Sequence, residues 1–255
     1  MIDGLYYGMF TPGQNVPAPL VDMHIYLELM DWVYAARVFR DTLTPNKLSD
    51  MVEQAASQSP EGADLRNALS AFATAVEAAM PIEISSTARS LLGRLSKPLP
   101  NVLADKVLLP DELFGAVGDL ASSFATSDKD FEAEELTLEK LKSQERLIDR
   151  LLAAGRVTQA VGVMREWLIL MVIYHSKERS AWRTMSVKDR AEKARFVSYD
   201  MFRKVDEIKK IRNYLYHHGV ADPTIDMATI PSAVKSHWKF FKQKADSPRD
   251  WATNL

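Results

Sequence analysis

Apolar residues recur every three or four positions along most of this chain, which is the spacing of an α-helix that buries one face. Residues 63–79 show the pattern clearly, with Leu65, Leu69, Phe72 and Val76 on one side. Only residues 5–10 (LYYGMF) are rich in strand-forming residue types. The sequence therefore predicts a mainly α fold, a helical bundle with at most a short N-terminal strand.

Glycines and prolines divide this pattern into segments. Prolines at 98, 100 and 110 mark residues 97–110 as a long connection, and Gly155 follows a helix as a C-terminal cap would. We expect residues 1–18 to form a short strand and loop, residues 19–128 a helical subdomain, and residues 129–255 a second helical domain. The other predicted helices are 20–40, 45–57, 86–95 (capped by Ser85 or Ser86), 111–126, 131–153, 157–173, 199–217 and 230–244, with a loop and short helix between 176 and 193.

Composition excludes several classes of chemistry. The chain has no cysteine, which excludes disulfides, thiol catalysis and cysteine-ligated metals and fits a reducing cytoplasm. The N-terminal segment MIDGLYYGMF lacks the basic and apolar regions of a signal peptide. The most apolar run, residues 167–174 (WLILMVIY), is too short to span a bilayer. We therefore expect a cytoplasmic protein without a membrane partner.

Charge is distributed unevenly along the chain. Residues 41–135 carry 7 Lys or Arg and 16 Asp or Glu, whereas residues 136–255 carry 23 and 14. A polyanion such as RNA would be attracted to the basic second half. The plainer interpretation is that long helices need solvated Lys and Arg on their outer faces.

Residues 211–219 (IRNYLYHHG) contain the clearest candidate for catalysis. On a helix, Asn213 and His217 share a face, and Arg212 lies about 100° round from Asn213. The fixed donors of an arginine suit a phosphate that gains negative charge, and a histidine can transfer a proton near neutral pH. These groups could support attack by an RNA 2′-hydroxyl on the adjacent phosphate without a metal or other cofactor. The alternative is a surface Arg212, an Asn213 in a fraying turn and a His217 that caps the helix, while His218 falls off the Asn213 face.

The spacing of Arg212 and His217 matches the Arg-x4-His signature of HEPN ribonucleases, and two further segments extend the likeness. LYYGMF is followed by a proline-containing loop and VDMHIYLELMDWVYAARVFRDTLTPNKL, and LLAAGRVTQAVGVMREWLILMV precedes the signature. In this order they resemble the C-terminal region of CRISPR-associated effector ribonucleases of type III systems, which join a CARF sensor domain to a HEPN domain.

This resemblance implies a HEPN-type helical domain that forms a homodimer. In that family two copies of the signature meet to form one site, which cuts single-stranded RNA and leaves a 2′,3′-cyclic phosphate and a 5′-hydroxyl. Arg212, Asn213 and His217 are the residues carried over by position. Only five residues precede Tyr6, so we expect no cyclic oligoadenylate binding by this chain, and a CRISPR-associated partner could supply the sensor. Two other functions stay open: a non-catalytic interaction or RNA-binding subunit of a CRISPR complex, and a HEPN toxin of a toxin–antitoxin pair.

Three other polar pairs attract attention. His24 and Glu28 are one helical turn apart, but one imidazole with nearby carboxylates is more typical of a solvated helix face than of a metal site. His175 and Glu178 are interpreted as a salt-linked helix end. Arg165 and Glu166 are interpreted as a buried structural ion pair or as support for the helix that carries Arg212.

Overall fold

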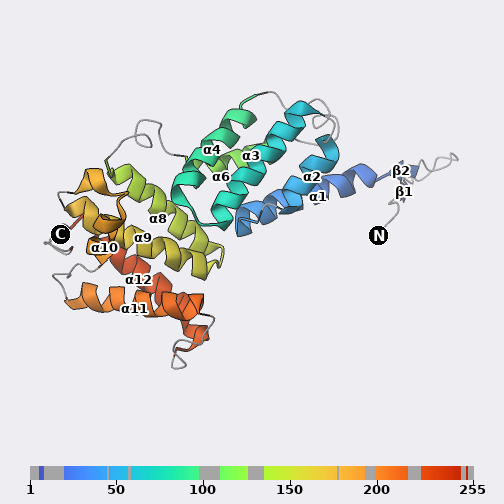
Figure 1. Ribbon diagram of the computed structural model, residues 1–255. Helices are drawn as coiled ribbons and strands as arrows, with labels where there is room; N and C mark the ends of the chain where they lie inside the picture. The colour runs from blue at the N-terminus through green and yellow to red at the C-terminus, as the bar shows by residue number, and fades with distance from the viewer. Residues whose placement is uncertain are drawn as a thin grey trace. The chain divides into compact units, whose positions relative to one another are not determined.

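The computed structural model describes residues 6–8, 20–44, 46–56, 59–97, 110–125, 135–176, 178–192, 199–217, 225–247 and 251. Within them the fold is mainly α-helical, as predicted (Figure 1). The expected domain boundaries, at residues 18 and 128, lie outside the described residues and stay predictions. By internal contacts the chain divides into two compact units, residues 1–71 with 90–120, and residues 72–89 with 121–255.

The N-terminal strand is confirmed, and it has a partner. Strand β1 (Tyr6–Gly8) pairs in antiparallel fashion with β2 (Leu20–Asp22), so that Tyr6 lies opposite Asp22. The helix predicted from residue 20 therefore begins at His24 instead. Leu20 and Val21 are apolar and fit either a helix or a strand, and the distant backbone partner decides between them.

The first unit contains α1 (His24–Thr42), α2 (Asn46–Ala56), most of α3 (Pro60–Glu77), the end of α4 (Pro81–Leu95) and α6 (Pro110–Ser122). Its core includes Phe39, Leu48 and Leu65, all essentially buried. Helix α4 begins at Pro81 rather than after Ser85, because proline is favoured in the first turn of a helix, where its missing N–H has no intrahelical acceptor.

The second unit is built around α9 (Val157–His175). The helices α8 (Leu138–Ala153), α10 (Met185–Glu192), α11 (Tyr199–Tyr216) and α12 (Ile230–Lys244) each contact it, and Figure 1 shows them grouped about it. Two short 3-10 turns, η1 (Arg179–Ala181) and η2 (Met227–Thr229), connect elements of this unit. Gly155 ends the α8 turn with φ 71°, the left-handed conformation that glycine favours.

Aromatic side chains fill the centre of the second unit. The Trp167 ring packs edge to face against Trp238, with centroids 5.0 Å apart, and against Trp251 at 5.7 Å. Trp251 is fully buried, and its indole N–H donates to the Lys244 carbonyl at 2.9 Å. These contacts hold Trp251 against α9.

Helix α9 is the one helix among the described residues that is long and apolar enough to cross a membrane. Of its most apolar window, 61% is buried inside the protein. The apolar run at residues 167–174 is too short by itself, so the length comes from the whole helix, and a buried core helix passes the same test of length and composition.

Candidate active site

Helix α11 carries the residues that the sequence singled out, and its amphipathic pattern fixes how they are presented. Its buried residues recur every three or four positions, which places one face against the neighbouring helices α9 and α12. The opposite face is solvated and ends with Asn213 and His217. The buried residues are Met201, Val205, Ile208, Ile211 and Tyr214.

Arg212 is held in place by two side chains of its own helix. Its Nη1 donates to Asn213 Oδ1 at 3.1 Å, and its Cζ lies 4.7 Å from the centroid of the Tyr216 ring. Within the described part of the chain, Arg212 forms no ion pair with a carboxylate. The guanidinium is therefore oriented but not neutralised, and its other N–H groups remain available to an anion.

Tyr216 in turn rests on α9. A Cβ placed on Gly162 would lie 2.6 Å from the Tyr216 hydroxyl oxygen, so any larger residue there would require the Tyr216 side chain to shift. Tyr216 is 48% exposed. Its contact with Arg212 is a role that helical periodicity alone did not indicate. A glycine inside a helical pattern was the signal for such a close approach.

His217 lies exposed at the end of α11, one turn beyond Asn213. Its backbone N–H donates to the Asn213 carbonyl at 2.9 Å, which extends the helical turn. Among the described residues, no hydrogen bond joins its ring to Arg212. Arg212 and Asn213 are thus in contact, whereas His217 shares the exposed helix end with them. His218 and Gly219 lie outside the described residues.

The pair Arg165 and Glu166 belongs to a half-buried network that supports α11. Arg165 donates to Glu166 at 2.8 Å and to Glu192 at 2.7 Å, which joins α9 to α10. Lys209 of α11 then donates to the Glu192 carbonyl at 3.2 Å. The ion pair is half-buried rather than buried as predicted, and its link through Glu192 to Lys209 agrees with the predicted support for α11.

A second contact fixes α11 to α12. His237 is largely buried, and its Nε2 lies 3.1 Å from Glu207 Oε2. Burial lowers the pKa of His237 below its ordinary value, although the Glu207 carboxylate acts in the opposite direction. Since burial dominates, the pair behaves near neutral pH as a neutral imidazole bonded to a carboxylate.

His24 and His175 are the other two histidines among the described residues. His24 Nε2 lies 3.4 Å from Glu28 Oε1, and both side chains are exposed. Across the described ranges, no group of three His, Asp or Glu side chains could hold a metal ion. The interpretation of His175 as salt-linked to Glu178 was wrong: its Nε2 donates to the Ala245 carbonyl at 3.1 Å, and its ring stacks on Trp251. Stacking the His175 ring on the Trp251 indole buries more surface than a solvent-exposed ion pair with Glu178 would.

Comparison with known proteins leaves the chain without a family assignment: no family model matches it, and a search of curated proteins finds no significant relative. What the site can do therefore has to be argued from its own residues. One copy offers one oriented guanidinium and one exposed imidazole at the end of a rigid helix, which suits binding of a phosphate and transfer of a proton beside it.

Proposed function

We propose that the chain is a metal-independent endoribonuclease of the HEPN type, which cuts single-stranded RNA. The main support is Arg212, whose guanidinium is fixed by Asn213 and Tyr216 at an exposed helix end and has no carboxylate partner among the described residues. The exposed His217 on the same helix end supplies the proton-transfer group.

In the proposed reaction, the RNA 2′-oxygen attacks the adjacent phosphorus, a new O2′–P bond forms and the P–O5′ bond breaks. Arg212 stabilises the negative charge that develops on the non-bridging oxygens. One His217 accepts the proton of the 2′-hydroxyl, and a second donates a proton to the leaving 5′-oxygen. The products are a 2′,3′-cyclic phosphate and a 5′-hydroxyl. Asn213 is a positioning residue, because it orients the guanidinium.

The proposed reaction uses two histidines, and among the described residues the end of α11 and the turn after it carry one, His217. We therefore infer a homodimer in which two copies of Arg212 and His217 face one phosphate. The sequence resemblance supports a role in cytoplasmic CRISPR-associated antiviral defence, with a separate sensor subunit as a candidate partner. A toxin of a toxin–antitoxin pair would use the same site.

The test is cleavage of a fluorogenic single-stranded RNA in excess EDTA. We expect cleavage by the wild type and its loss in Arg212→Ala and in His217→Ala. Two matched controls should keep full activity: Arg203→Ala, which removes an exposed arginine from the same helix, and His24→Ala. Undiminished cleavage by both site variants would refute the assignment, as would cleavage of a strand that carries 2′-deoxyribose throughout.

The second candidate function, a non-catalytic interaction subunit, is favoured by a different observation. Helix α1 exposes large apolar side chains, among them Tyr26, Met30 and Val33. Contiguous apolar surface of this kind is typical of a protein–protein contact. This function predicts no RNA cleavage under any condition, so the same assay separates the two.

A further inference from the structure

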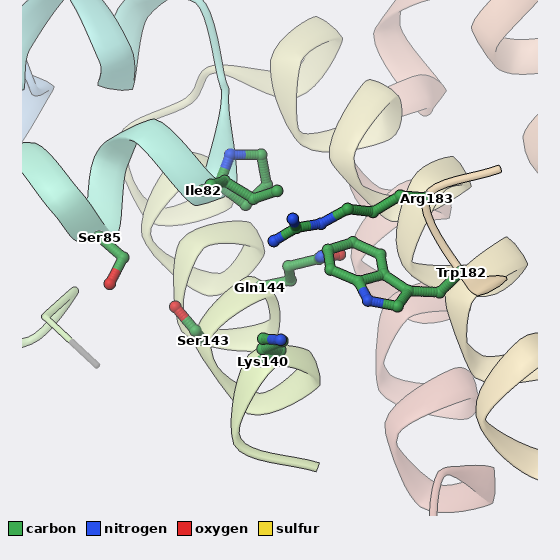
Figure 2. A pocket seen from close by; sticks show the side chains of 8 residues that line it. Ile82, Ser85, Lys140, Ser143, Gln144, Trp182 and Arg183 are labelled. Carbon is green, nitrogen blue, oxygen red and sulfur yellow. The ribbon is translucent and has the colours of Figure 1, made fainter. Parts of the chain in front are cut away.

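A small pocket in the second unit lies between the start of α4, the start of α8 and the residues that follow η1 (Figure 2). It encloses about 30 Å³ of free space. A single water molecule needs roughly 10–15 Å³ by a comparable measure, so the open pocket has room for two or three water-sized atoms, which suits one side of a phosphate group but not a nucleobase. None of its lining residues belongs to α11, so a ligand in this pocket would be independent of the proposed nuclease activity.

One side chain in this pocket is buried without a partner. Gln144 of α8 is 6% exposed, and its Oε1 has no hydrogen-bond partner among the described residues. Ser143, next to it, is also buried, and its hydroxyl forms no hydrogen bond within that part of the chain. A buried amide oxygen left unpaired is unfavourable, which points to a ligand that donates a hydrogen bond to Gln144.

The pocket is also positively charged. In Figure 2 the Arg183 side chain extends past the Trp182 ring toward Ile82, and its Cζ lies 4.9 Å from the Trp182 ring centroid. Lys140 Nζ lies 5.1 Å from the same ring and donates to the Glu135 carbonyl at 2.9 Å. No Asp or Glu side chain is among the described residues that line the pocket. A ligand that binds here is therefore expected to carry negative charge.

The start of α4 adds to this preference for an anion. Ile82, in the first turn of that helix, lines the pocket, and α4 is 15 residues long. The first N–H groups of a helix have no intrahelical acceptor and carry partial positive charge. In Figure 2 the hydroxyls of Ser85, from α4, and Ser143, from α8, turn toward each other at one side of the pocket.

We propose that this pocket binds a phosphate group that carries a hydroxyl. Arg183 and Lys140 attract its charge, the Ser143 hydroxyl and the start of α4 donate to its oxygens, and its remaining hydroxyl donates to Gln144 Oε1. Inorganic phosphate carries such a proton on a large part of its molecules near neutral pH, whereas a phosphate monoester, whose second pKa is about 6, carries it mainly at lower pH. Sulfate has the same size and shape but no proton, so it satisfies the cationic groups and leaves Gln144 unpaired.

The test is isothermal titration calorimetry of the full chain with inorganic phosphate and with sulfate at equal ionic strength. We expect phosphate to bind roughly tenfold or more tightly than sulfate, because the unpaired acceptor is satisfied only by phosphate. Gln144→Leu should remove this preference, and Arg183→Ala should weaken binding of both anions by roughly tenfold. Lys142→Ala, which removes an exposed charge two residues from Lys140, should leave both affinities unchanged.

Absence of phosphate binding, equal binding of phosphate and sulfate, or unchanged binding in Arg183→Ala would each overturn the proposal. Arg183 is exposed, so its variant tests the pocket even if Gln144→Leu does not fold. Ribose 5-phosphate, titrated beside inorganic phosphate at about pH 6 so that both keep a proton, distinguishes the two sources of the ligand. Tighter binding of the ester than of the free ion identifies a sugar phosphate as the natural ligand, and the reverse order identifies inorganic phosphate.

Discussion

The close approach of Gly162 to Tyr216 predicts that the effect of Gly162→Ala on the free energy of unfolding depends on the hydroxyl group of residue 216. In the wild type, a methyl added by Gly162→Ala would lie 2.6 Å from the Tyr216 oxygen and 3.8 Å from the ring carbon that bears it. The hydroxyl would have to move by roughly 1 Å to restore ordinary van der Waals contact. In a Tyr216→Phe background that oxygen is absent, and the nearest ring carbon already lies at a normal contact distance.

The magnitudes follow from helix propensity and from this displacement. Alanine stabilises a helix interior by about 0.5–1 kcal/mol relative to glycine. We expect Gly162→Ala to raise the free energy of unfolding by about that amount in the Tyr216→Phe background. In the wild type the displaced tyrosine should cancel the gain. It should also loosen Arg212, whose contact with an exposed ring contributes about 0.5–1 kcal/mol.

A double-mutant cycle of urea unfolding measures this difference. The wild type, both single variants and the double variant are compared by circular dichroism, so that changes common to the glycine replacement cancel. A coupling of about 0.5–1 kcal/mol supports the close approach. If Gly162→Ala stabilised both backgrounds equally, the argument that Tyr216 rests on α9 would fail.

Two further predictions concern the core of the second unit. Trp251→Ala should lower the free energy of unfolding by about 3–5 kcal/mol, because a fully buried indole and its packing are lost; in urea unfolding Trp251→Phe should cost clearly less, and an equal effect would contradict the role of ring packing. Burial lowers the pKa of both His175 and His237 below the usual 6.5, so the folded state resists their protonation. Stability should therefore fall as the pH drops from 6.5 through the lowered values, and replacing both by Gln should flatten that part of the urea midpoint–pH profile.

Periodicity predicted the helices well where one face is buried throughout. Helix α12 begins and ends where the sequence indicated, since Val234, Trp238 and Phe241 lie on one buried stripe. It failed where a distant partner or a local backbone preference decides. Leu20 pairs with Gly8 in a strand, and Pro81 begins a helix that the sequence pattern predicted only after Ser85.

The site was partly visible in the sequence. Helical geometry separates Arg212 from Asn213 by about 100°, yet the long arginine side chain turns back to meet Asn213. The role of Tyr216 could not be derived in the same way, because it depends on the approach of α9 at Gly162, far away in the chain. Whether His217 and Arg212 can contact the same phosphate depends on how a second copy of the chain is placed. The sequence of a single helix does not determine that placement.

A distance measurement between two copies of α11 tests the shared site most directly. The chain has no cysteine, so Lys210→Cys, one turn before Asn213 on the exposed face, allows a single spin label without other changes. Two helix ends that flank one phosphate should place the labels on the order of 20 Å apart, about two helix diameters. Double electron–electron resonance should detect this intermolecular distance. A monomer without coupling, or a dimer in which the labels lie at opposite ends, would contradict a composite site formed by Arg212 and His217.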